Sequence, residues 1–250
     1  EIAQCLVGSE MCIRDRYATD EDVPVNPLTG ERLRMGGNTS TQAYFKAGDP
    51  IWVDVNGDYI IDEKDKVIVG NSQPRMTGGI SINLRYKAFS INTNCSFTLR
   101  RDIINKALAD RFRAYGTPVA GKVDLTKSGA LTPIEAYNFW TEDNIYAQYP
   151  NPFDYTRSSI IQPFRYDQTL FMEDGSYFKI NGISLAYTIP KNILSFFRIS
   201  RCQLNFSMNN IYTFSKYSGI NPENVSSLGY DTSGGYPNGR TVTFGVSMDF

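Results

Sequence analysis

The 250-residue sequence contains no histidine. This absence excludes Ser-His-Asp and Cys-His nucleophilic centres and removes a ligand that most zinc sites use. Two pairs of adjacent carboxylates, Glu142-Asp143 and Glu173-Asp174, have no sign of a cleft around them. No nucleophile is accompanied by a base. The sequence therefore predicts a protein that is not an enzyme.

The sequence also lacks an excess of charge of either sign. Its 25 basic and 26 acidic residues give a net charge of −1 at pH 7. Proteins that bind nucleic acid use a strongly basic surface, because contacts with the phosphate backbone dominate the affinity. We therefore expect no nucleic-acid partner.

No CxxC pair occurs among the four cysteines. Cys95 and Cys202 each lie inside a stretch with the alternation of a strand, and Cys5 and Cys12 lie in an atypical amino-terminal segment. Because no paired spacing is present, the cysteines do not indicate a disulfide framework. We interpret Cys95 and Cys202 as small apolar residues of their strands.

Long apolar runs are absent as well, since no stretch approaches the roughly 20 apolar residues of a membrane helix. The strands of a membrane barrel alternate in polarity and escape that criterion. The last eleven residues, 240–250, alternate strictly, and roughly 9–11 residues suffice for a tilted strand to cross the hydrocarbon core. The apolar positions, which we predict to face lipid, are Val242, Phe244, Val246, Met248 and Phe250.

Four more segments show the same period of two, which is the period of a β-strand. The segment that begins at Tyr177 changes phase at Asn181-Gly182, and this change predicts a β-bulge. The five predicted strands therefore have one apolar face and one face rich in Ser, Thr, Asn and Gln. The four additional segments are residues 80–86, 89–99, 177–189 and 203–209.

The connections between these strands are alternately short and long. A turn at Lys87 is followed by a long loop at 100–170, a short connector at 190–200 and an intermediate loop at 215–239. Short turns on one side and long loops on the other are typical of outer-membrane barrels. A soluble barrel with its apolar face turned inward remains an alternative on this pattern alone.

An acidic stretch at residues 54–65 has the oxygen spacing of an EF-hand calcium loop. Position six is Tyr59 in place of glycine, so the sharp turn must come from Gly57 or from strain. The alternative is a solvated acidic turn. No cofactor is required otherwise, and a calcium ion is the one candidate. Its predicted ligands are Asp54, Asn56, Asp58, the carbonyl of Ile60, Asp62 and Asp65.

The amino-terminal residues 1–16 match the rest of the chain in neither period nor composition, and they lack the pattern of a signal peptide. We interpret them as a non-native linker sequence, and we assign residues 17–250 to the carboxy-terminal part of a longer barrel protein. Residues 17–48 are rich in turn formers and predict a loop with at most one hairpin. Residues 134–140 predict a short helical turn.

Four blocks of the sequence resemble, in their order, the carboxy-terminal part of SusC/RagA-type TonB-linked outer-membrane transporters. Together they cover most of residues 49–250, and Tyr59 stands where the family commonly has glycine. The blocks are GDPIWVDVNGDYIIDEKDKVIVGNSQPRMTGGISINLRYKAFSIN, FMEDGSYFKINGISLAYTIPKNIL, NNIYTFSKYSGINPE and GYPNGRTVTFGVSMDF.

This resemblance implies an all-β fold in which about five antiparallel strands belong to a transmembrane barrel of roughly 22 strands. The five strands would form an open sheet with long external loops. The implied function is nutrient import through the outer membrane of a Gram-negative, Bacteroidetes-like bacterium. Long loops would be extracellular and the carboxy terminus periplasmic. The implied partners are a SusD-type surface lipoprotein, TonB acting on an amino-terminal region, an oligosaccharide or peptide substrate, and outer-membrane lipid.

A second interpretation is a secreted, calcium-stabilised β-sandwich that binds glycans. The two interpretations differ in solubility, because a sandwich should purify as a monomer without detergent, whereas a barrel segment should not.

Overall fold

The computed structural model describes residues 7–9, 16–36, 40–115, 118–119, 122–123, 136–152, 154, 157, 159–194, 199–231 and 238–249. The chain divides into two compact units. Unit 1 comprises Glu1–Gln73, Ile103–Glu173 and Asn224–Gly234. Unit 2 comprises Pro74–Asp102, Asp174–Glu223 and Gly235–Phe250.

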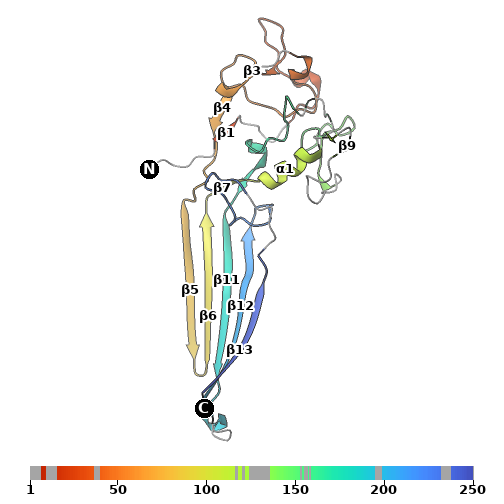
Figure 1. Cartoon of the computed structure of the whole chain (residues 1–250). Coiled ribbons are helices and arrows are strands. Elements are labelled where there is room, and N and C mark those ends of the chain that lie inside the picture. Colours follow the sequence, from red (N-terminus) through yellow and green to blue (C-terminus); the bar gives the residue numbers. More distant parts are fainter. Residues whose placement is uncertain are drawn as a thin grey trace. The chain divides into compact units, whose positions relative to one another are not determined.

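Unit 2 is built on one antiparallel sheet of five long strands, seen side by side in Figure 1. Each strand pairs with its sequence neighbour in the sheet, so the order across the sheet is β5-β6-β11-β12-β13. Both edge strands, β5 and β13, have one side that is not paired within the described residues. The strands are β5 (Met76–Tyr86), β6 (Phe89–Leu99), β11 (Tyr177–Thr188), β12 (Arg201–Ser215) and β13 (Thr241–Asp249).

The register of the sheet places apolar residues of all five strands in common rows. One row contains Leu84, Ile91, Leu185, Phe206 and Phe244. The next row is polar, because successive side chains of a strand point to opposite faces. The alternation predicted from the sequence is therefore confirmed as one apolar and one polar face. The polar row contains Asn83, Asn92, Ser184, Ser207 and Thr243.

The predicted bulge lies in β11, where the pairing with both neighbouring strands shifts between Ile180 and Gly182. The extra residue, Asn181, lets Ile180 and Ile183 occupy the same face although they are three residues apart. A β-carbon at position 182 would lie 2.9 Å from Asn209 Oδ1 and 3.3 Å from the Met208 carbonyl oxygen, so a larger residue there would displace the Asn209 side chain and crowd β12.

The two ends of the sheet differ in the length of the connections between their strands. At the turn end, β5 joins β6 through a tight turn in which Lys87 has a φ of 51°, and β11 joins β12 through a segment with the short helix α2 (Lys191–Leu194). At the loop end lie Met76, Leu99, Tyr177 and Ser215. The prediction for 203–209 was too short, since β12 extends to Ser215.

Unit 1 contains little regular structure, and its longest element is the helix α1 (Lys106–Tyr115). The side-chain amide oxygen of Asn105 caps this helix by accepting from the Leu108 N–H at 3.0 Å. The sequence analysis did not predict α1. None of the helices among the described residues is both long enough and apolar enough to cross a membrane.

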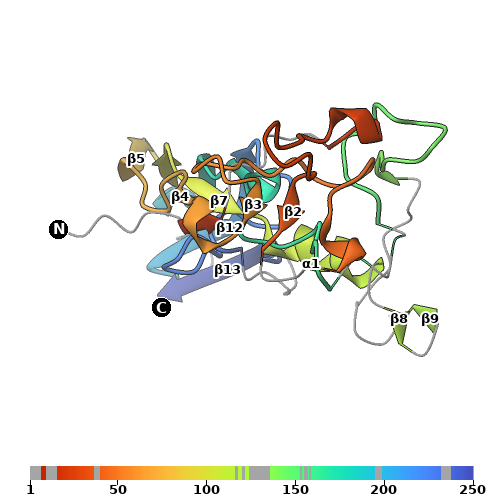
Figure 2. The ribbon, with the colours of Figure 1, turned by 90° about the horizontal axis from the view of Figure 1, so that it is seen from above.

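Short strands and 3-10 turns make up the remaining regular elements. β2 (Arg34–Met35) lies beside β3 (Ile60–Ile61), as Figure 2 shows. β1 (Val7–Ser9) pairs with β4 (Lys66–Ile68), and β7 (Asp102–Ile104) pairs with β10 (Met172–Asp174). The others are β8 (Pro118–Val119), β9 (Lys122–Val123), η1 (Asp20–Asp22), η2 (Thr41–Ala43), η3 (Glu63–Asp65) and η5 (Thr169–Phe171).

Two apolar clusters form the core of unit 1. The first surrounds Phe112 of α1, whose ring packs edge-on against Tyr137, Phe139 and Tyr149 with centroids 4.8–4.9 Å apart. Such edge-to-face contacts stabilise beyond the area they bury. The second cluster comprises Tyr17, Val23, Leu33, Phe45, Trp52, Ile61 and Ile161.

Three expectations about loops meet the structure in different ways. Residues 17–36 contain a turn closed by the Val25–Arg32 bridge, in agreement with a loop carrying one hairpin. The helical turn expected at 134–140 lies partly outside the described residues, and Phe139 forms a bridge with Tyr149. The interpretation of residues 1–16 as a non-native linker stays a prediction, and most of that segment lies outside the described residues.

Candidate functional site

The apolar face of the unit 2 sheet leaves large side chains of all five strands exposed. Val242, Phe244, Val246 and Met248 of β13 are 50%, 78%, 58% and 49% exposed. Ile82, Leu84, Leu185 and Leu204 on the other strands are exposed as well. Soluble monomers rarely tolerate a contiguous apolar patch beyond a few hundred Å². The face therefore requires an apolar environment. Phe250, the fifth apolar position of the terminal strand, lies outside the described residues.

Aromatic rings gather at both ends of this apolar face. At the loop end, Phe178 lies 6.3 Å from Phe214, and Tyr212 lies 4.6 Å from Phe214, centroid to centroid. At the turn end, Phe89 lies 4.5 Å from Tyr187.

The spacing of the two aromatic groups can be measured on β6, where Phe89 and Phe97 are eight residues apart. At the rise of a strand this is about 26 Å along the chain. Outer-membrane barrels carry aromatic girdles on both sides of an apolar band about 25 Å tall. The apolar face thus has both the composition and the dimension of a lipid-facing surface.

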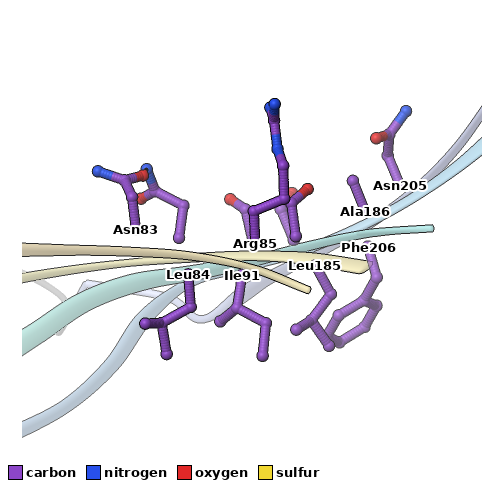
Figure 3. A pocket seen from close by; sticks show the side chains of 12 residues that line it. Asn83, Leu84, Arg85, Ile91, Leu185, Ala186, Asn205 and Phe206 are labelled. Carbon is purple, nitrogen blue, oxygen red and sulfur yellow. Dashed lines mark hydrogen bonds between the residues drawn. The ribbon is translucent and has the colours of Figure 1, made fainter. Parts of the chain in front are cut away.

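Most side chains of the polar face are uncharged, and Arg85 and Lys179 are basic residues on that face. A pocket of about 710 Å³ lies against the sheet toward its turn end, and Figure 3 shows Asn83, Arg85 and Asn205 on one side of the strands and Leu84 and Phe206 on the other. Cross-strand hydrogen bonds link the polar groups of this face. Ser81 Oγ donates to Asn94 Oδ1 at 2.8 Å, and Asn92 Nδ2 donates to Asn83 Oδ1. Amides and hydroxyls both donate and accept, so this face suits uncharged polar ligands such as sugars or peptide backbone.

The acidic stretch at 54–65 forms a chain of backbone-capping turns. Both carboxylate oxygens of Asp54 accept backbone N–H groups, from Gly57 and from Tyr59, each at 2.7 Å. Asp58 accepts from the Ile60 N–H at 2.9 Å. Gly57 and Tyr59 have φ values of 75° and 62°, so the sharp turn comes from both the glycine and a strained tyrosine. Both sources of the turn anticipated from the sequence are therefore present.

The last part of this stretch is turned inward. Asp62 accepts from the Lys64 N–H at 2.8 Å, and the fully buried Asp65 accepts from the N–H groups of Val55 and Asp62 at 3.0 and 2.8 Å. Among the described residues no group of three or more acidic or cysteine side chains is close enough to hold a metal ion. The carboxylates satisfy the backbone in this geometry, and calcium binding stays a prediction.

A buried ion pair in unit 1 was not predicted from the sequence. The Arg157 guanidinium donates to Asp49 Oδ2 and, at 2.7 Å, to the Tyr44 carbonyl. Both side chains are nearly inaccessible. Burial raises the pKa of Asp49 to about 6, although the charge and hydrogen bond of Arg157 act in the opposite direction. The two residues are 108 positions apart, so no local pattern could have revealed the pair.

Comparison with known proteins gives relatives of one kind. The chain is 27% identical over 231 residues to TonB-dependent receptor P3 of Formosa agariphila, an alignment that covers 86% of the chain. It is 24% identical over 242 residues to TonB-dependent receptor SusC of Bacteroides thetaiotaomicron, with 88% of the chain covered. The chain spans about a fifth of the length of these relatives, 21% in each case. No family model matches the chain.

Solved structures with the same fold are those of a transporter. The RagAB peptide importer in its open-open state gives a TM-score of 0.57 at 21% identity, over 82% of this chain and 21% of that chain. The closed-closed state gives 0.54 at 19% identity, over 90% and 22%.

These likenesses confirm the predicted fold class and the resemblance to SusC/RagA-type TonB-dependent transporters. The β-sandwich alternative is not supported, because the described residues contain one long-stranded sheet and otherwise only two-stranded ones.

Proposed function

We propose that this chain is the carboxy-terminal barrel segment of a TonB-dependent nutrient importer in the bacterial outer membrane. The observation that carries the proposal is the two-faced sheet: an apolar face with exposed large side chains on all five strands, bounded by aromatic rings, and a polar face dominated by serine, threonine and asparagine. In this proposal the apolar face, including Val242, Phe244, Val246, Met248 and Phe250, faces lipid, and the polar face lines the interior of the barrel.

The unpaired edges of the sheet support a closed barrel in the complete protein. β5 and β13 each have one side without a strand partner among the described residues. In hydrocarbon an unsatisfied backbone N–H or C=O costs several kcal/mol, so spanning sheets close on themselves. The remaining strands would come from the four fifths of the relatives that this chain does not cover.

The connection lengths support the orientation of the segment. The hairpin at Lys87 and the connector with α2 are short. The long connections between the strands run through unit 1 and attach to the strands at the loop end. In outer-membrane barrels the periplasmic turns are short and the extracellular loops long. We therefore assign the turn end to the periplasm and the loop end to the cell exterior.

The substrate and partner classes follow from the named relatives and from the chemistry of the polar face. We assign a peptide or oligosaccharide as the substrate, since amides and hydroxyls line the 710 Å³ pocket and the similar solved structures are of a peptide importer. A SusD-type lipoprotein at the outer rim and TonB on the periplasmic side would be the partners, as the likeness to SusC and RagAB suggests.

Uptake by living cells tests this function. Cells with the complete gene deleted are given labelled oligopeptides and labelled oligosaccharides in parallel, with the deletion complemented by the parent gene or by a gene truncated before β5. We expect one of the two pools to enter only with the parent gene and only when TonB is present. Unchanged uptake of both pools after deletion would contradict the proposal.

A further inference from the structure

A short segment after β12, residues 217–223, folds back against the polar face of the sheet at its loop end. Lys179 lies on that face, because it pairs in register with Ser96 and Thr213. Lys179 is only 7% exposed and Thr98 only 4%, whereas polar-face residues in the middle of the sheet are open. The segment 217–223 supplies the cover over Lys179.

Two basic side chains of the sheet hold this segment. Lys179 Nζ donates to Glu223 Oε2 at 2.5 Å. The Arg101 guanidinium, just beyond β6, donates to the carbonyl oxygen of Pro222. Burial lowers the pKa of Arg101, and the nearby Glu223 carboxylate acts against that change. Adjacent residues of the segment are therefore bound by Lys179 of β11 and by Arg101, which follows β6.

The segment itself has a defined shape. The Asn221 side-chain oxygen accepts from the Glu223 N–H at 2.9 Å, and Asn221 is buried. A β-carbon at Gly219 would lie 2.3–2.5 Å from the end of the Tyr217 side chain, so a larger residue there would displace the tyrosine. A cavity of about 270 Å³ remains beneath the segment, lined among others by Lys179, Thr213 and Glu223.

We propose that residues 217–223 form a fixed strap across the outer mouth of the passage, held by Lys179 and Arg101, and that this strap sets the largest solute that can enter. The proposal rests on the proposed function, because only a barrel with the polar face inside places the strap in the passage. The backbone and side chains of the strap occupy part of the outer opening of the passage. The position of the strap therefore sets the size of the largest solute that can pass.

Neutralising both members of the Lys179–Glu223 ion pair should release the strap from the sheet. Removing one member of a buried ion pair leaves an uncompensated charge, whereas replacing both members by neutral residues of similar size is far less harmful to the fold. The double variant Lys179→Met/Glu223→Gln therefore loosens the strap with the least effect on the sheet. A matched control is Lys106→Met/Asp110→Gln, which neutralises an exposed ion pair of α1.

The test uses the complete protein in intact cells, with every native cysteine replaced by serine, including those at positions 5, 12, 95 and 202, and a reporter cysteine at Thr213→Cys. Maleimide reagents of increasing polyethylene-glycol length are added from outside, and labelling is read by gel mobility. We expect the parent to react with small reagents only, and the double variant to react several-fold faster with long ones. The control should behave as the parent does, and heat-modifiable mobility on the same gels verifies folding.

A second variant keeps the test decisive if the double variant does not fold. Pro222→Gly leaves the Lys179–Glu223 pair in place but frees the backbone of the segment, and with the reporter it should also react faster with long reagents than the parent does. Equal labelling by all reagents in the parent and in the folded variants overturns the strap while leaving the proposed function intact. Absence of labelling by every reagent overturns the placement of the polar face, and with it both proposals.

Discussion

Phe206 of β12 lies directly opposite Phe244 of β13, with the two ring centroids 5.0 Å apart on the apolar face. Phe244 is nevertheless 78% exposed. A pair of phenylalanines that contact each other and still leave most of one ring uncovered does not form a core. It belongs to an exposed apolar surface, which the proposed function places against lipid, and other apolar rows of the sheet are exposed in the same way.

The aromatic cluster around Phe112 should carry much of the stability of unit 1. Phe112→Ala removes a fully buried ring with three edge-on neighbours, and we expect a loss of about 3–5 kcal/mol in the free energy of unfolding. Hydrogen exchange of peptides from residues 103–173, measured by mass spectrometry in the complete protein at increasing urea concentrations, reports the unfolding of this unit. Tyr146→Ala, at a side chain that is 80% exposed, should change the transition by less than about 0.5 kcal/mol.

The strand positions were predictable because alternation is a local property. The bulge at Asn181 could be placed for the same reason, since Ile180 and Ile183 had to share a face. The helix α1 was missed, because its buried residues Ala109 and Phe112 gain their partners from segments far along the chain. The same is true of Asp49 with Arg157 and of Lys179 with Glu223. Side-chain pairs separated by 44 or 108 positions leave no period in the sequence.

Asp49 should make the stability of unit 1 fall as the pH rises from about 4 to about 6. Its pKa is raised from 3.8 to about 6 in the folded protein, so between these values the folded state binds more protons than the unfolded state. The shift corresponds to roughly 3 kcal/mol at most. Urea titrations of parent and Asp49→Asn across this range measure the difference. The parent should lose stability relative to the variant as the pH rises; a parallel course for the two proteins would contradict the raised pKa.

A β-carbon at position 57 should destabilise the turn of the acidic stretch. Its φ is 75°, and a β-carbon there would meet no neighbour within 4 Å, so the cost of Gly57→Ala is backbone strain alone, about 1–2 kcal/mol. Gly57→Asn is the matched control at the same site, because asparagine adopts a positive φ more readily than alanine does. The unfolding of unit 1, followed by hydrogen exchange of its peptides in the complete protein, should shift more for Gly57→Ala than for Gly57→Asn. Equal effects would show that strain at position 57 is not the cause.

We propose that the acidic stretch 54–65 binds a calcium ion by rearranging side chains that now accept backbone N–H groups. Titration calorimetry of the complete protein should give calcium-dependent heat that Asp58→Ala abolishes, because Asp58 is exposed and can turn toward an ion. Glu21→Ala is a suitable control at an exposed acidic site outside the stretch. A parent protein without calcium-dependent heat would leave only a solvated turn.

The central claim is that the apolar face of the sheet faces lipid, and neighbouring residues of β13 test it most directly. Phe244 and Thr243 lie on opposite faces of the same strand. In the complete protein folded into lipid vesicles, the free energy of unfolding is measured for Phe244→Arg and Thr243→Arg. We predict a loss of about 2–4 kcal/mol for Phe244→Arg, as for arginine near the bilayer midplane, and a much smaller loss for Thr243→Arg. Equal losses at the two positions, or the larger loss at Thr243, would contradict the account.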